Sequence, residues 1–320
     1  MKIVYENRSC FTHLGPDATK GNIIKLAVDA EKEGFDSLWV AERLLWPLKP
    51  QTPYVATPDG SLPTFYQNVF DPIETLTFVA AHTNKIALGT SVIDMLFHNP
   101  VVLARRFATL DVLSEGRAVC GLGIGWSKDE YQASNIPFKD RGKRADEFVQ
   151  AIKKIWTEDV VEFKGQFYNI PASKIGPKPI QKPHIPIYLG GYVPKTFARI
   201  ANHADGWLAS LSGPLDFLHN SIKSLRDEAS RANRSPDEIK ILTLTFPQIT
   251  LSEWKKNNTS NNMKGGSQPQ RFPLTGTIEE IGRDIQRIKE MGVEHIMFAF
   301  VGLGLDKVVD IAKQLSKFAR

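Results

Sequence analysis

Four short stretches of the sequence carry residue types that could bind or react with a small molecule, and each follows a short apolar run. The first is the charged pair Glu42-Arg43, which could orient or protonate a substrate. A salt bridge at the rim of the fold is an equally good interpretation of this pair. The second is Thr90-Ser91-Val92, whose small and hydroxyl-bearing residues would let a flat ligand approach the backbone. On spacing alone, a plain buried strand explains this second stretch better.

The other two stretches are rich in glycine. Gly121, Gly123 and Gly125 remove side chains from the end of an apolar run, either beside a bulky ligand or where a helix packs closely on a strand. Gly190-Gly191-Tyr192 precedes a helical pattern, so its free N–H groups and the helix dipole could hold an anion. A tight turn between strand and helix is the alternative, and we prefer a phosphate site.

Motifs for metal binding and for nucleophilic catalysis are missing from the sequence. The seven histidines do not cluster, and there is no His-Glu-x-x-His, no Gly-x-Ser-x-Gly elbow and no Walker lysine. His13 and His98 fall at or near strand ends, and we interpret both as structural. The residues by themselves therefore predict a phosphate-bearing ligand and no metal.

These stretches need a scaffold that brings them together. Apolar runs predict buried strands at residues 2–5, 37–41, 86–92, 118–124, 187–190, 206–209, 241–245 and 295–300. Segments with helical spacing lie between them, and Asn99-Pro100 and the pair Thr277 and Glu280 predict helix starts. Eight strand–helix repeats predict a (β/α)8 TIM barrel, whose active site lies at the carboxyl ends of the strands. A doubly wound sheet would carry a glycine-rich phosphate-binding turn after its first strand, which this chain lacks.

Three longer segments interrupt this alternation, at about residues 45–70, 158–186 and 251–272. The second predicts a β-hairpin around Gly165, and the third has the composition of a mobile loop. We expect one domain over residues 1–320, with these segments as insertions in the barrel.

Composition excludes several classes of function. The net charge is +5 over 320 residues and the basic residues are scattered, whereas a nucleic-acid-binding protein would show a basic stripe. Two cysteines, Cys10 and Cys120, make neither a disulfide framework nor a metal site. No apolar stretch approaches the roughly 18 residues of a membrane span, and the chain opens without a signal-type segment. We expect a cytoplasmic protein with no nucleic-acid or membrane partner.

Taken together, the motifs resemble the luciferase-like monooxygenase family, which includes oxidoreductases that depend on coenzyme F420. The matching motifs are G-F-D-S-L-W-V-A-E at 34–42, I-A-L-G-T-S-V at 86–92, H-N-P at 98–100, A-T-L-D-V-L-S-E-G-R at 108–117, G-L-G-I-G-W at 121–126, F-K-G-Q-F-Y at 163–168 and A-D-G-W at 204–207. They occur in order along nearly the whole chain, with residues 251–272 as the main divergent piece.

The resemblance implies a TIM barrel that binds F420 or FMN at the carboxyl ends of its strands, and its closest likeness is to the F420-dependent branch. It implies that Thr90, Ser91 and Val92 form a bulge behind the cofactor ring, often with a non-proline cis peptide. It further implies that Gly121, Gly123 and Gly125 line the cofactor and that Gly190, Gly191 and Tyr192 hold its phosphate. Homodimerisation is also implied.

The chain departs from the family pattern at two positions. Relatives often carry an acidic residue followed by histidine where this chain has Glu42-Arg43, and Trp126 stands where some F420 enzymes place a glutamate. Because arginine is never deprotonated in proteins, Arg43 cannot act as a general acid or base, but it could hold an anionic substrate or stabilise a negative ring. We expect Glu42 and Arg43 to be the catalytic pair that orients the substrate.

Three functions follow from the resemblance. The first is F420-dependent hydride transfer to or from a small organic substrate, with residues 251–272 as a lid. The second is an FMN-dependent monooxygenase that uses reduced flavin and O2. The third is a non-catalytic flavin-binding protein, which the missing histidine after Glu42 would explain.

Overall fold

The computed structural model describes residues 9–12, 18–54, 57, 59–211, 213–249, 271–300 and 305–319. Within these ranges eight parallel strands form a ring: β1 (Ser9–Thr12), β2 (Ser37–Val40), β3 (Ala87–Thr90), β5 (Ala118–Gly123), β8 (Ile187–Gly190), β9 (Gly206–Leu211), β10 (Lys240–Thr245) and β13 (His295–Phe300). β1 pairs with both β2 and β13, and β3 pairs with β5 through Leu88 opposite Ala118. Each strand of the ring therefore has a neighbour on both sides, which confirms the predicted TIM barrel.

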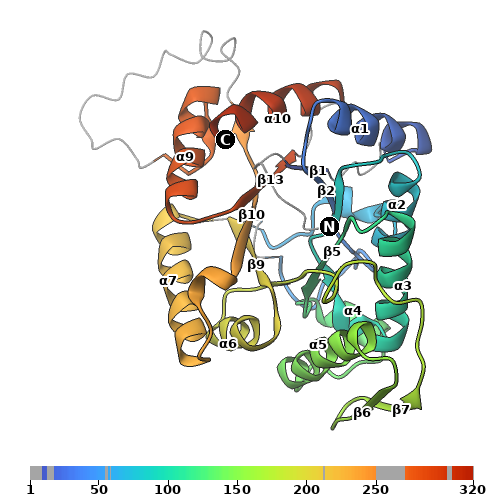
Figure 1. Ribbon diagram of the computed structural model, residues 1–320. Helices are drawn as coiled ribbons and strands as arrows, with labels where there is room; N and C mark the ends of the chain where they lie inside the picture. The colour runs from blue at the N-terminus through green and yellow to red at the C-terminus, as the bar shows by residue number, and fades with distance from the viewer. Residues whose placement is uncertain are drawn as a thin grey trace.

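Helices cover the outside of the ring (Figure 1). Those that follow the eight strands are α1 (Lys20–Lys32), α2 (Pro72–Ala80), α3 (Pro100–Leu113), α5 (Arg141–Thr157), α6 (Pro194–His203), α7 (Leu215–Arg231), α9 (Ile278–Glu290) and α10 (Leu305–Ala319). The two predicted helix starts are confirmed. The Asn99 side chain accepts the backbone N–H of Val101, and Thr277 forms a capping box with Glu280. None of the helices in the described ranges has the length and apolar character needed to cross a membrane.

Large side chains fill the inside of the barrel, so the ring is a packed core rather than a pore. Trp39, Tyr188 and Met297 are buried in this inner cluster. The Trp39 ring occupies the space in front of Gly89, where a Cβ would lie 2.3 Å from a ring carbon. Its Nε1–H donates to the Ser37 hydroxyl at 2.6 Å. The buried interior leaves the strand ends as the place for a site.

The predicted strand at residues 2–5 lies outside the described residues. The first strand of the ring that the structure describes is β1, at residues where the sequence predicts no strand. Pairing with β2 and β13 fixes its place, which a four-residue Ser-Cys-Phe-Thr run does not reveal. The predicted strand at 86–92 is too long, because β3 ends at Thr90; a separate short strand, β4 (Ile93–Asp94), follows it and pairs with β5.

The predicted insertions have different structures. Around Gly165, β6 (Val161–Lys164) and β7 (Asn169–Ser173) form the predicted antiparallel hairpin. The described part of residues 45–70 holds one 3-10 turn, η2 (Thr64–Gln67), and residues 251–270 lie outside the described ranges. The other short elements are α4 (Lys128–Ala133) after β5, the parallel pair β11 (Gln248–Ile249) and β12 (Thr275–Gly276), and the 3-10 turns η3 (Met95–Phe97) and η4 (Pro236–Glu238).

Candidate active site

The chain leaves β3 through a turn in which the Ser91–Val92 peptide bond is cis, as the resemblance implies. Two backbone hydrogen bonds attach this turn to the segment after β2. Ser91 N–H donates to the Val40 carbonyl at 2.8 Å, and Glu42 N–H donates to the Val92 carbonyl at 3.1 Å. The Thr90 hydroxyl donates to the Gly121 carbonyl at 2.7 Å. The predicted residues Thr90, Ser91 and Val92 therefore lie together at the carboxyl end of the barrel.

The glycines of β5 let the turn pack closely against that strand. A Cβ at Gly121 would lie 1.8 Å from the Thr90 carbonyl oxygen, and one at Gly123 would lie 2.6 Å from a Val92 methyl carbon. Gly125 has a φ of +70°, which favours glycine. The chain itself fills the space beside Gly121 and Gly123, so close packing accounts for both residues. Their contact with a cofactor stays a prediction.

Gly190 and Gly191 lead into the start of α6. At Gly190 the nearest atom to an added Cβ is a Val92 methyl carbon at 3.5 Å, which leaves ordinary space, and Gly191 has a φ of +123°. The Tyr192 hydroxyl donates to the Ser210 carbonyl at 2.6 Å, which ties the turn to β9. No side chain caps the start of α6. Pro194 has no N–H and the Thr196 N–H donates to the Val193 carbonyl at 2.8 Å, so Lys195 carries the backbone N–H of the first turn that an anion could still reach.

A pocket of about 580 Å³ lies between the N-terminal end of α5 and the length of α6, from Val193 to His203. Its charged lining residues are Arg141, Lys143, Lys195, Arg199, Asp140 and Asp146. Arg199 Nε lies 2.6 Å from an Asp146 carboxylate oxygen. Among the described residues, neither Lys143 nor Lys195 has an ion-pair partner. The pocket therefore holds positive charge that the chain does not compensate.

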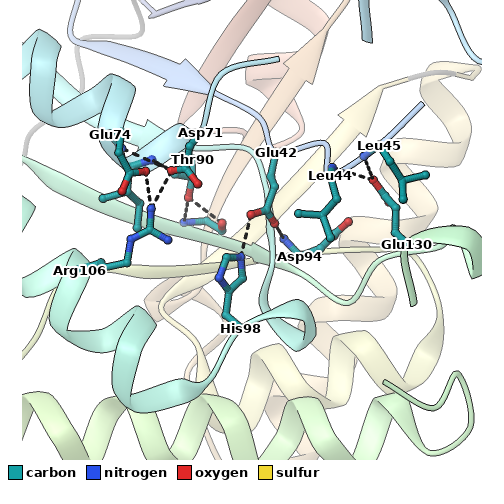
Figure 2. Close-up of polar contacts among 12 residues, drawn as sticks. Glu42, Leu44, Leu45, Asp71, Glu74, Thr90, Asp94, His98, Arg106 and Glu130 are labelled. Carbon is teal, nitrogen blue, oxygen red and sulfur yellow. Dashed lines mark hydrogen bonds and ion pairs between the residues drawn. The ribbon is translucent and has the colours of Figure 1, made fainter. Parts of the chain in front are cut away.

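Glu42 uses both carboxylate oxygens within the protein (Figure 2). Its Oε1 accepts a hydrogen bond from Nε2 of His98 at 2.7 Å, and its Oε2 accepts the backbone N–H of Asp94 at 2.9 Å. Glu42 is buried, with 9% of its surface exposed. His98, which we interpret as structural from the sequence, is thus the direct partner of a predicted catalytic residue.

Arg43 turns toward α4. Its Nη2 lies 3.0 Å from Oε2 of Glu130, and the two side chains are only 7% and 1% exposed. Glu130 Oε1 also accepts the backbone N–H of Leu44 at 2.9 Å (Figure 2). The guanidinium carbon lies 5.1 Å from the Trp126 ring centroid and 5.7 Å from that of Tyr66, so the cation is within cation–π distance of both rings. The role of Arg43 toward a substrate stays a prediction, but its charge is already balanced.

A third carboxyl group, on Asp94, lies beside these two pairs. Burial, then the negative charges of Glu42 and Glu130, raise the pKa of Asp94 to about 7. Burial also raises the pKa of Glu130. Asp94 follows the 86–92 run by two residues, which is the only sequence signal that could have pointed to it. Within the described ranges no three His, Cys, Asp or Glu side chains are placed to hold a metal ion.

The fold and the site define a barrel protein whose candidate functional residues lie at the carboxyl ends of its strands. Within that class, the chain belongs to the luciferase-like monooxygenase family, whose family model matches residues 7–253. An uncharacterized protein of Mycobacterium tuberculosis is 36% identical over 208 residues, which cover 64% of this chain and 72% of the relative. The F420-dependent glucose-6-phosphate dehydrogenase of Kineococcus radiotolerans is 30% identical, over 68% of this chain and 61% of the relative.

Solved structures with the same fold include an F420-dependent reductase and a monooxygenase. The coenzyme F420-dependent tetrahydromethanopterin reductase of Methanopyrus kandleri has a TM-score of 0.73 at 19% identity, over 96% of this chain and 98% of that one. A long-chain alkane monooxygenase has a TM-score of 0.73 at 16% identity, over 99% of this chain and 91% of that one. At these identities the likeness establishes the shared barrel.

Proposed function

We propose that this protein is an oxidoreductase that uses coenzyme F420 to transfer a hydride to or from a small organic substrate. The named relative at 30% identity is an F420-dependent dehydrogenase, which supports this cofactor. When bound, the deazaflavin ring supplies the hydride donor or acceptor. The residues of this chain supply binding, orientation and exclusion of water.

The pocket between α5 and α6 is the observation that carries the proposal. FMN ends in a single phosphate, whereas F420 continues beyond its phosphate into a tail of carboxylates. Four cationic side chains line the pocket against two carboxylates, and the lining begins at Val193, two residues after the Gly190-Gly191 turn. This net charge of about +2 would attract the phosphate of FMN, at about −2, as well as F420, so the pocket supports an anionic cofactor and the F420-dependent relative favours F420.

The candidate site fits such a ligand at both of its ends. Gly190, Gly191 and Tyr192 would hold the phosphate, because the start of α6 has no side-chain cap and Gly190 leaves space for an approaching group. The turn at Thr90, Ser91 and Val92 would support the ring, with Gly121, Gly123 and Gly125 beside it. A small neutral substrate suits the carboxyl end of the barrel near Arg43 better than an anion does, because Glu130 already balances the charge of Arg43.

Titration of the purified protein with F420 and, separately, with FMN tests the proposal by fluorescence. We expect F420 to bind more tightly, and we expect its affinity to fall more steeply with salt because more charges are paired. Binding of FMN without F420 would favour the FMN-dependent monooxygenase instead. Binding of either cofactor without turnover across a broad substrate panel would favour the non-catalytic flavin-binding protein.

A cytoplasmic location and a homodimer are further proposals that rest on the sequence and on the resemblance. Sedimentation of the purified protein at several concentrations would test the dimer.

A further inference from the structure

Glu42 occupies the position of a candidate catalytic acid, yet the chain itself engages it at three points. Its backbone N–H donates to the Val92 carbonyl, its Oε2 accepts the N–H of Asp94, and its Oε1 accepts Nε2 of His98. All three partners belong to the connection between β3 and α3. A single residue after β2 therefore fixes the path of that connection.

This connection carries Val92, whose side chain lies at the predicted site of the cofactor ring. One methyl carbon of Val92 lies only 2.6 Å from a Cβ added at Gly123, and the other lies 3.5 Å from a Cβ added at Gly190, which is ordinary van der Waals contact. Val92 thus reaches the ends of β5 and β8 from the turn after β3. A shift of the turn would move Val92 relative to both glycines.

We infer that Glu42 is a positioning residue, whose carboxylate holds the turn from Ser91 to Asp94 in the shape that receives the cofactor ring. The inference deepens the proposed function and rests on it, because the ring in question is that of F420. It assigns Glu42 no proton exchange with substrate. One oxygen is occupied by a backbone N–H and the other by an imidazole, and the side chain is only 5% exposed.

Two substitutions separate positioning from acid catalysis. Glu42→Gln keeps both contacts, because the amide oxygen can accept the Asp94 N–H and the amide nitrogen can donate to an unprotonated Nε2 of His98. Glu42→Ala loses both. We expect Glu42→Gln to bind F420 within about threefold of wild type, and Glu42→Ala to bind at least about tenfold more weakly.

The matched control is Glu31→Ala, at the opposite end of β3. Glu31 accepts the backbone N–H groups of Lys85 at 2.7 Å and Ile86 at 3.0 Å, so it also holds the chain beside this strand, but before the strand begins. We expect this variant to lower the midpoint of urea unfolding and to leave F420 affinity unchanged. Equal losses of affinity in Glu31→Ala and Glu42→Ala would overturn the inference, since general destabilisation would explain both.

If Glu42 were a catalytic acid, its replacement would reduce turnover and leave the affinity for F420 unchanged. If Glu42→Gln and Glu42→Ala both bind F420 as wild type does and both abolish turnover, the inference is wrong. Should Glu42→Ala fail to fold, His98→Ala removes one contact only, and we expect it to weaken F420 binding by about threefold to tenfold; unchanged affinity would count against positioning. If wild type binds FMN and not F420, the proposed function fails, and the same variants titrated with FMN still decide the positioning role.

Discussion

Nη2 of Arg43 lies 3.0 Å from Oε2 of Glu130, and both side chains are almost fully withdrawn from solvent. The cation nearest the β2 end of the barrel is therefore matched within the protein. Uncompensated positive charge lies elsewhere, on Lys143 and Lys195 between α5 and α6. If the cofactor is anionic, we therefore expect Lys143 and Lys195 to attract it rather than Arg43.

Replacing Arg43 should destabilise the fold, whatever the substrate. Arg43→Met leaves the carboxylate of Glu130 buried without its cation, and losing one partner of a buried ion pair costs about 3–5 kcal/mol. The free energy of unfolding in urea measures the loss. The double variant Arg43→Met with Glu130→Leu should lose less than the single variant, because no charge remains buried. A single-variant loss below about 1 kcal/mol would show that the pair contributes little.

Stability should depend on pH through Asp94. Its pKa of about 7 in the folded protein lies above that of an unfolded aspartate, so the folded state keeps a proton that the unfolded chain has released. The free energy of unfolding therefore falls as the pH rises between those two values. Relative to Asp94→Asn, which does not titrate, wild type should lose about 1 kcal/mol per pH unit between roughly pH 5 and 7.

Thermal unfolding of both proteins across this range measures the difference. The gap between wild type and Asp94→Asn should level off above about pH 8, where Asp94 is ionised in both states. Asp227→Asn, on the exposed face of α7 and without an ion pair among the described residues, controls for the loss of a carboxyl group. A gap that stays constant with pH would contradict the raised pKa of Asp94.

Replacing either of two glycines at the carboxyl end of the barrel by alanine should change the stability of the fold by different amounts. Gly121→Ala places a Cβ 1.8 Å from the Thr90 carbonyl oxygen, so the backbone itself must move, and we expect a loss of about 3 kcal/mol or more. At Gly190 the added Cβ meets nothing nearer than 3.5 Å, and Gly190→Ala should change stability by less than about 0.5 kcal/mol. Urea unfolding compares them. Similar losses at both positions would contradict the packing of β5 on the turn.

Charge reversal in the pocket between α5 and α6 should separate the two cofactors. Lys143→Glu combined with Lys195→Glu should weaken F420 binding by about tenfold at low salt and FMN binding by much less. Lys223→Glu on α7 changes the net charge without touching this pocket and serves as the control. Equal weakening of both cofactors would mean that the pocket receives only the shared phosphate.

Several elements could be read from the sequence because local chemistry specifies them. The strands at 187–190 and 295–300 match β8 and β13, since each is a short apolar run. Asn99 and Thr277 mark helix starts through hydrogen bonds to backbone N–H groups two or three residues away. The sequence did not predict β1, because its place depends on pairing with β2 and β13 rather than on its own four residues.

The sequence alone placed Glu42 and Arg43 side by side after a buried strand and predicted one catalytic pair. The tertiary structure decided that they belong to different networks, with Glu42 bound to His98 and Arg43 bound to Glu130. Adjacent side chains at a strand end point to different sides, so each meets a different part of the chain. Those partners lie far along the sequence, and only the closure of the barrel brings them within hydrogen-bonding distance.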